Sequence, residues 1–162
     1  NLPNLLRIKI SIKDKAEIAD YFRILQGGEI KKHVIPWIEK NNPEISTEIY
    51  NRIKMASNIT KHEINVANKF RKDLISEVNI SLPKGNIAIF PTTPFSAPLC
   101  GQDEYALAES RKKRMAMTSI SGMTSRPQIS IPKLKDKTGP VGISLLGWEN
   151  SDEILLNKLT EI

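Results

Sequence analysis

A change of pattern near residue 85 constrains the fold of this chain most. Before it, apolar residues recur three and four positions apart through charged stretches, as on the buried face of amphipathic helices. After Pro83-Lys84-Gly85, short apolar runs are bounded by turn-forming residues, as in strands that are buried on both faces. We therefore predict an α/β protein in which helices pack on a mixed β-sheet.

The first half is predicted to be helical with a break inside it. A helix opens near Asp14, and the glycine pair Gly27-Gly28 weakens it. Pro36 must kink or restart the pattern, because proline has no amide donor and clashes with the preceding turn.

Local end signals mark two further helices before the strands begin. One is predicted over residues 43–56, with Pro43 in its first turn. The next starts with Thr60 and Glu63, whose spacing fits a capping box, and runs to about residue 78. In the second half, strands are predicted over residues 86–90, 128–131 and 141–146, and helices over residues 103–119 and 151–159.

Length and composition fit one ordinary globular domain, since 40% of the 162 residues are hydrophobic. No run of about eighteen apolar residues is present, and the single Cys100 excludes an internal disulfide. We expect a soluble, cytoplasmic protein with no membrane partner. The start, Asn1-Leu2-Pro3-Asn4, has neither an initiating Met nor a signal-peptide pattern, so we interpret it as a cut.

The positive charge does not indicate a nucleic-acid partner. Lys and Arg number 24 and Asp and Glu 18, giving a net charge of +6, but the basic residues are spread through the helical stretches. The densest run, Arg111–Arg114, lacks interleaved aromatic residues and fits a solvated helix face.

No local motif identifies a catalytic or metal site. His33 and His62 are interpreted as surface or cap residues, and Cys100 as an incidental thiol unless a base lies near it in space. Ser119 and Ser121 could be nucleophiles with Lys112 or Lys113 as base. Hydroxyl residues at a helix end more often bond to the local backbone, so the structural interpretation is favoured. An unrelated small α/β enzyme that uses these residues stays open.

A series of proline- and glycine-containing segments resembles the C-terminal part of the amidase signature family. The first is Pro91-Thr92-Thr93-Pro94 followed by Ala97-Pro98, directly after a predicted strand. The later segments keep family-like spacing; they are 118–122 (TSISG), 126–132 (RPQISIP), 139–147 (GPVGISLLG) and 151–156 (SDEILL). Upstream, residues 22–29 (FRILQGGE) are similar to a subgroup that includes indole acetamide hydrolase-like amidases.

The resemblance implies that residues 1–162 are the C-terminal part of a single amidase domain with an incomplete sheet. It implies hydrolysis of carboxylic amides to acid and ammonia by a serine, a second serine with a cis peptide bond, and a lysine. All three belong to a catalytic N-terminal part that would precede Asn1, so no catalytic residue is assigned here. No cofactor and no metal are implied. Thr92, Thr93 and Pro94 are the candidate substrate-pocket residues.

One turn departs from the family pattern. Ser125 and Arg126 stand where related sequences usually have glycine and leucine. We expect a backbone angle that suits glycine better than serine, and a charge in place of an apolar contact.

Two functional hypotheses follow for the chain. The first is a fragment or subunit of an amidase, inactive alone, whose partners are the missing N-terminal part, in cis or as a separate chain, and a small amide substrate. The second is a catalytically inactive amidase-like interaction module. A fragment cut through a sheet should expose a strand edge and an apolar face, so marginal stability or a homo-oligomer is expected.

Overall fold

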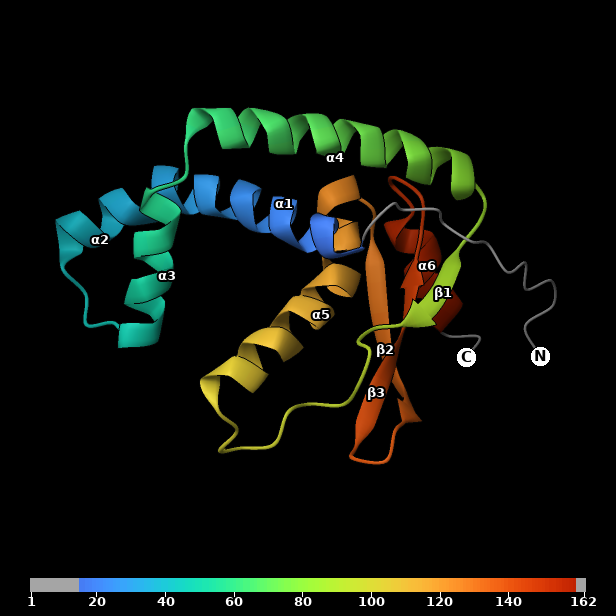
Figure 1. The fold of residues 1–162 in the computed structure, drawn as a ribbon. Helices are drawn as coiled ribbons and strands as arrows, with labels where there is room; N and C mark the ends of the chain where they lie inside the picture. The colour runs from blue at the N-terminus through green and yellow to red at the C-terminus, as the bar shows by residue number, and fades with distance from the viewer. Residues whose placement is uncertain (1–14, 160–162) are drawn as a thin grey trace.

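The computed structural model describes residues 15–159, and Figure 1 shows their arrangement. The predicted helix start at Asp14 and the residues around Asn1 lie outside the described part. In chain order the elements are α1 (Lys15–Glu29), the π-helix η1 (Ile30–Val34), α2 (Ile35–Asn41), α3 (Thr47–Ser57), α4 (Lys61–Ser81), β1 (Ala88–Pro91), α5 (Glu104–Thr124), β2 (Gln128–Lys135), β3 (Pro140–Leu146) and α6 (Asp152–Leu159). The α/β class predicted from the sequence is confirmed.

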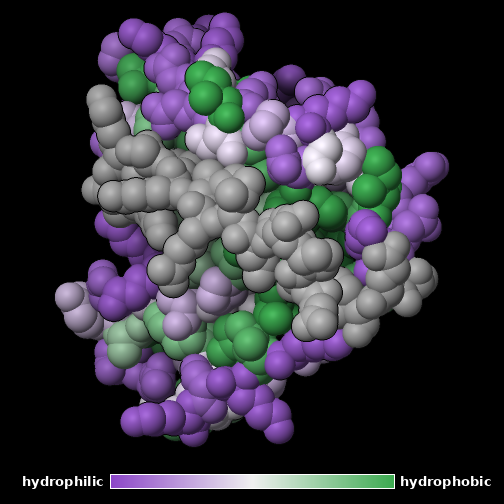
Figure 2. All heavy atoms as spheres, turned by 90° about the vertical axis from the view of Figure 1, so that its right-hand side faces the viewer, coloured by the Kyte–Doolittle hydropathy of each residue, from purple (hydrophilic) through white to green (hydrophobic). Residues whose placement is uncertain are grey.

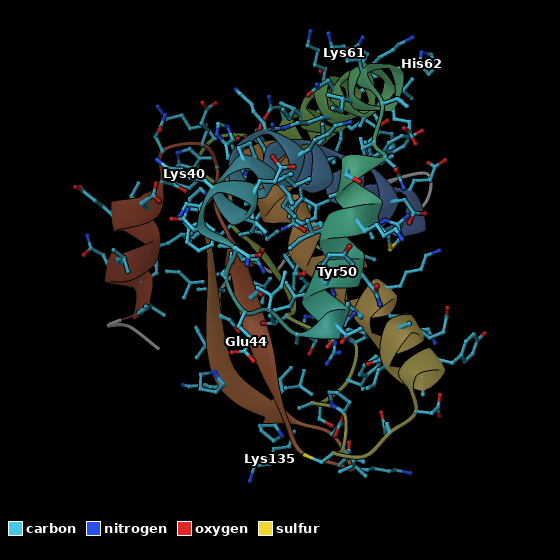
Figure 3. The ribbon with its side chains drawn as sticks, turned by 90° about the vertical axis from the view of Figure 1, so that its left-hand side faces the viewer. Lys40, Glu44, Tyr50, Lys61, His62 and Lys135 are labelled. Carbon is cyan, nitrogen blue, oxygen red and sulfur yellow. The ribbon has the colours of Figure 1, made fainter. Side chains whose placement is uncertain are left out.

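The described strands form a three-stranded sheet in the order β1-β3-β2, and both pairings are antiparallel. Strands β1 and β2 therefore run in the same direction on either side of β3, and α5 connects them. This arrangement explains why the sequence shows strand–helix–strand alternation although no two described strands pair in parallel. Helices α1, α4 and α5 lie on one side of the sheet and α6 on the other (Figures 1 and 3).

The core forms where the helical layer meets the sheet. Its buried apolar side chains come from α1, α4 and the residue after it, α5 and the end of β3; they are Ile18, Leu74, Val78, Leu82, Ile120, Met123 and Leu146. Tyr21 and Phe70 stack beside it with ring centroids 4.3 Å apart. Burial of each large apolar side chain stabilises the fold by about 1.5–3 kcal/mol, so this cluster fixes the helices on the sheet.

The break predicted at Pro36 is present as a π-helix. Because Pro36 has no amide hydrogen, the regular helical ladder cannot continue through it. The amide of Ile35 donates to the carbonyl of Ile30, one residue farther back than in an α-helix, and α2 then starts with the proline in its first turn. The pair Gly27-Gly28 does not end α1, which continues to Glu29.

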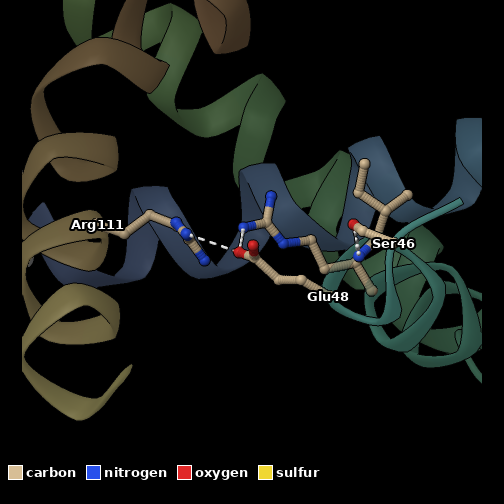
Figure 4. A network of polar contacts seen from close by, with 5 residues as sticks. Ser46, Glu48 and Arg111 are labelled. Atoms are coloured by element: carbon tan, nitrogen blue, oxygen red, sulfur yellow. Dashed lines mark hydrogen bonds and ion pairs between the residues drawn. The ribbon is translucent and has the colours of Figure 1, made fainter. Parts of the chain in front are cut away.

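Helix α3 begins later than predicted. Pro43 lies in the preceding loop, and Ser46 is the N-cap, with its hydroxyl accepting from the amide of Ile49. Glu48, in the first turn, pairs with Arg52 of the same helix and with Arg111 of α5, and thereby joins two helices far apart in sequence (Figure 4). Arg111, the first residue of the basic run, thus has a structural partner.

The capping box predicted at the start of α4 is confirmed. The hydroxyl of Thr60 accepts from the amide of Glu63, and the Glu63 carboxylate accepts from the amide of Thr60. The hydrogen bond from the Thr60 hydroxyl to the Glu63 carboxylate, followed by that from the Thr60 amide, lowers the pKa of Glu63. Two amide donors that the helix leaves unpaired are satisfied in this way.

The turn after α5 has the glycine-like backbone expected at Ser125, and the side chain of Arg71 holds this turn. Ser125 adopts a left-handed conformation (φ 55°, ψ 33°), which favours glycine. Arg71 of α4 donates through Nε to the carbonyl of Met123 at 2.8 Å and through Nη2 to the hydroxyl of Ser125 at 3.0 Å. Arg71 therefore ties the end of α5 to α4.

Arg126 is not a surface charge, because the residue is only 5% exposed. Its guanidinium donates to the carbonyl of Gly147 at 3.0 Å, the carbonyl of Leu82 at 3.0 Å and Oδ1 of Asn79 at 2.8 Å. Burial lowers the pKa of Arg126, and the charge of Glu149 opposes that shift. Where an apolar contact was expected, the guanidinium joins α4, the residue after it and the end of β3.

Candidate functional site

The three candidate pocket residues lie at the end of β1, in different surroundings. Thr92 follows the strand directly, and its amide donates to the carbonyl of Gly142 at 2.7 Å, which extends the β1–β3 ladder by one residue. The hydroxyl of Thr93 donates to the carbonyl of Phe95 at 2.8 Å and so closes a local turn. Pro94 is exposed in that turn. Of the three, Thr92 faces other strands.

Thr92 belongs to a hydroxyl cluster, which consists of Thr92, Gln128, Ser130 and Ser144. The hydroxyl of Thr92 lies 2.7 Å from Oγ of Ser130 and 2.8 Å from Oγ of Ser144. Nε2 of Gln128 donates to Oγ of Ser144 at 2.7 Å. The cluster brings together the end of β1, strand β3 and strand β2, over sequence separations of 16, 38 and 52 residues.

Strand register explains why these side chains meet. Ser144 pairs with Phe90 on one side and with Ser130 on the other. Because successive side chains of a strand point to opposite faces, Ser144 shares its face with Leu146, which belongs to the core. The hydroxyl cluster therefore continues the core-facing side of the sheet, at the point where apolar side chains give way to polar ones.

The cluster extends from the interior to the surface. Ser144 is fully buried, Thr92 and Gln128 are half-buried, and Ser130 is exposed. Gln128 donates to Ser144, whereas in the Thr92–Ser144 and Thr92–Ser130 contacts either hydroxyl can be the donor. The exposed Ser130 is the member of the cluster that a ligand above the sheet could reach.

Gly142 provides the space that the cluster occupies. A Cβ atom at this position would lie 2.6 Å from Oγ1 of Thr92 and in still closer contact with Oγ of Ser130. Any larger residue would force these hydroxyls apart. Gly142 is the second glycine of the 139–147 segment, so the motif has a steric role at this position.

The chemistry of the cluster suits binding better than attack. Within residues 15–159, no histidine or carboxylate hydrogen-bonds to these hydroxyls. A serine or threonine needs a positioned base to become a nucleophile. A hydroxyl can nevertheless donate to a carbonyl oxygen and accept from an N–H, and a carboxamide offers both.

A second polar arrangement holds the segment that carries Thr92 and Thr93. The carboxylate of Asp136 accepts from the amides of Ser96 (2.7 Å), Thr138 (2.7 Å) and Gly139 (2.9 Å) and from the hydroxyl of Thr138 (2.8 Å). The hydroxyls of Ser96 and Thr138 also contact each other. These bonds fasten the loop after β1 to the turn between β2 and β3.

The hydrogen bond from the Ser96 amide, followed by those from Thr138, holds the pKa of Asp136 well below its usual range. A depressed pKa means that the stabilisation is complete above the ordinary value of 3.8 and is lost as the pH falls below it. We expect Asp136→Asn to lower the free energy of unfolding at pH 7 and to speed amide exchange at Ser96. The difference from the unaltered chain should shrink on acidification below about pH 4.

Urea unfolding between pH 3 and pH 7 measures this effect, with Asp73→Asn on α4 as the matched control. A difference between Asp136→Asn and the unaltered chain that does not change with pH would contradict the proposed role of the carboxylate.

The serines considered as nucleophiles are engaged with the backbone. The hydroxyl of Ser119 donates to the carbonyl of Met115, and that of Ser121 donates to the carbonyl of Arg126 at 2.6 Å. Lys112 lies two turns before Ser119 on α5 and approaches Asp20 of α1, with 3.8 Å between Nζ and Oδ2. Both serines bond to the local backbone, as the structural interpretation expected, and no serine–lysine pair forms here. The helix does not end at residue 119 as predicted: α5 continues to Thr124, so both serines lie within its last two turns.

The histidines and the cysteine occupy the surface. Nε2 of His33 lies 3.2 Å from the Glu29 carboxylate on an exposed helix side, and His62 lies in the first turn of α4 and points outward (Figure 3). Cys100 is exposed in a loop. No group of three or more potential metal-ligating side chains was found in the described part of the chain. None of its helices is long and apolar enough to cross a membrane.

Sequence comparison and structure comparison both find proteins named as amidases. Amidase 1 of Arabidopsis thaliana is 28% identical over 140 residues, which cover 86% of this chain. Amidase 1 of Oryza sativa subsp. japonica is 26% identical over 153 residues, which cover 94%. A solved amidase structure superposes on 92% of the chain with a TM-score of 0.73 at 16% sequence identity. The chain is similar to amidases.

The similarity covers only part of these amidases. The chain spans about a third of each of these proteins, namely 33% and 35% of the two plant amidases and 34% of the solved amidase. A protein named Translocon at the outer membrane of chloroplasts 64, from Pisum sativum, is also similar, at 21% identity over 142 residues. No protein-family model matches the chain.

The residues that sequence reasoning missed are Gln128, Ser130, Gly142 and Ser144. A signal for them exists in the sequence. Gln128 and Ser130 are two positions apart and thus share a strand face, and Ser144 interrupts an otherwise apolar strand. Polar residues at such positions indicate that a buried sheet face has a polar end.

Proposed function

We propose that this chain is the C-terminal part of an amidase domain that hydrolyses carboxylic amides to acid and ammonia. The observation that carries the proposal is the hydroxyl cluster on a sheet whose fold is that of an amidase. The cluster is partly open to the surface and offers both donors and acceptors, which complement the carbonyl and N–H of a carboxamide.

In this proposal the catalytic serine, the cis-peptide serine and the lysine lie in the remaining part of the amidase, and the present chain supplies one wall of the substrate pocket. Thr92 would contact the substrate amide directly or through Ser130, with Thr93 and Pro94 shaping the adjoining turn. The partner is that remaining part, in the same polypeptide or as a separate one, and the chain alone is inactive. A cytoplasmic location is proposed together with it.

Substrates of the indole acetamide class are a proposal that rests on residues 22–29, which resemble that amidase subgroup. The alternative, an inactive amidase-like interaction module, is less favoured, because identity to the two plant amidases (28% and 26%) exceeds that to the chloroplast translocon component (21%). It stays as an outcome of the test.

The test is ammonia release from a panel of aryl and alkyl amides, including indole-3-acetamide. The purified chain should release no ammonia alone and should become active when it is combined with a polypeptide that carries the remaining part of the amidase. Activity of the isolated chain would overturn the division of roles. A stable complex without hydrolysis of any amide would favour the interaction module.

The role of the hydroxyl cluster can be tested in the active assembly. Thr92→Val keeps the shape of the side chain but removes its hydroxyl, so kcat/KM should fall about tenfold, which corresponds to one hydrogen bond of about 1.4 kcal/mol. Thr118→Val is the matched control, because that hydroxyl bonds only to the carbonyl of Arg114 on the surface of α5. Equal effects of both substitutions would remove the cluster from the pocket.

A further inference from the structure

A pocket lies between α1, α4 and the end of α5, and none of its lining residues belongs to the hydroxyl cluster. It has a volume of about 500 Å³, which is within the range of small-molecule sites. Its apolar lining comes from Phe22, Leu25, Ile64 and Met123. Polar and charged groups complete the lining: Gln26, Glu29, Lys32, Asn68 and Arg71. Much of the 22–29 segment, which the proposed catalytic role does not use, thus lines this pocket.

Glycines hold the pocket walls in place by allowing close helix contacts. A Cβ at Gly122 would lie 2.9 Å from Cε2 of Phe22, and one at Gly28 would lie 3.0 Å from Cδ1 of Ile64. The aromatic ring of Phe22 and the branched side chain of Ile64 are therefore packed against backbone. Two of the apolar lining residues are thus packed closely against neighbouring helices.

Arg71 provides an oriented cation at one end of the pocket. Its Nε and Nη2 are held by the carbonyl of Met123 and the hydroxyl of Ser125. Among residues 15–159, no partner binds Nη1, so its two N–H groups remain available. A guanidinium held in this way is preorganised, so it can bind a carboxylate with little further loss of side-chain entropy.

The other charges of the pocket do not cancel this cation. Glu29 and Lys32 carry opposite charges and lie three residues apart, on adjacent positions of the α1–η1 helical face. The Glu29 carboxylate contacts Nε2 of His33 at 3.2 Å. Phe70, the neighbour of Arg71 in α4, stacks on Tyr21 of α1. Glu29 and Lys32 lie at least eight positions farther along the helix than Tyr21, which is about 12 Å. The end of the pocket beside Arg71 is therefore cationic.

We propose that this pocket binds a small organic acid, with its carboxylate on Arg71 and its apolar body on Phe22, Leu25 and Ile64. An apolar lining with one oriented cation complements a monocarboxylate with an aromatic or branched body, and neither feature requires amide hydrolysis. The site is separate from the hydroxyl cluster, and its test measures binding. Failure of the proposed amidase function and failure of this site would therefore be distinguishable.

The experiment is titration of the 162-residue chain with phenylacetate and 4-phenylbutyrate, followed by amide chemical shifts and calorimetry. The alcohols with the same carbon skeletons are the neutral comparison. We expect the acids to shift the resonances of α1, α4 and the end of α5, and the alcohols to bind at least tenfold more weakly.

Two variants separate the carboxylate contact from the apolar surface. Arg71→Gln should weaken binding of the acids at least tenfold. Asn68→Trp should fill the pocket and abolish binding while it leaves Arg71 and its bonds to α5 intact. Lys69→Gln, one position farther along α4 and outside the pocket, should bind as the unaltered chain does.

Three results would overturn the proposal. These are equal affinity for acids and alcohols, shifts confined to another part of the chain, and the absence of binding by a folded chain. Unchanged binding in Asn68→Trp would also place the acid elsewhere.

Discussion

Replacement of Arg126 by leucine should lower the free energy of unfolding by about 3 kcal/mol. The substitution leaves the carbonyls of Leu82 and Gly147 without their donor in a buried place. Each unsatisfied buried acceptor costs about 1–3 kcal/mol, and removal of the buried charge together with the added apolar contact offsets only part of that cost. Chemical denaturation at pH 7 measures the change.

Two further variants make the interpretation of Arg126 specific. Arg126→Lys should lose less stability than the leucine variant, because an ammonium group can satisfy one of the acceptors but cannot span all three. Lys113→Leu, at an exposed position of α5, should stay within about 0.5 kcal/mol of the unaltered chain. A leucine variant as stable as the unaltered chain would show that the two carbonyls find other donors.

Gly142→Val should lower the free energy of unfolding by about 3 kcal/mol and disrupt the hydroxyl cluster. The added Cβ would meet the hydroxyls of Thr92 and Ser130. Overpacking costs about 1–3 kcal/mol, and each severed hydrogen bond adds about 0.5–1.5 kcal/mol. In the active assembly, the same substitution should reduce amide hydrolysis at least as strongly as Thr92→Val does.

The control for Gly142 lies in the same segment. A Cβ at Gly139 would lie 3.5 Å from Cβ of Ser96, which is an ordinary contact, so Gly139→Ala should be tolerated. Gly142→Ala should be intermediate, since it adds only the first carbon. If alanine at both positions had equal effects on stability, the requirement for space at Gly142 would be refuted.

Features of the fold that depend only on residues close together in the sequence could be predicted. The capping box of Thr60 and Glu63 and the break at Pro36 arise from local chemistry and lie where expected. The start of α3 was misplaced, because Pro43 and Ser46 are both suitable at a helix start and only the fold decides between them. The order of the strands could not be predicted either, because hydrophobic periodicity shows where a strand lies but not which strand it pairs with.

The candidate site shows the same limit more strongly. Thr92 was singled out from its segment, but its partners Ser130 and Ser144 lie 38 and 52 residues away. Sheet register alone brings them together. For Arg126 the sequence indicated a misplaced charge, whereas the structure gives that charge three acceptors. A charged residue at a position where an apolar one was expected can thus make buried structural contacts of its own.

The position of β3 between β1 and β2 has a consequence for the order of folding. The middle strand is the last of the three to be synthesised, and neither outer strand pairs with the other. The helices can condense early, but the sheet must await residues 140–146. Strand β2 then pairs with β3 across a short turn, whereas the pairing of β1 with β3 closes a loop of about 50 residues, a slow step because loop closure precedes the gain from pairing. Until that strand is inserted, the nascent chain carries two unpaired strands and depends on rapid completion to avoid aggregation.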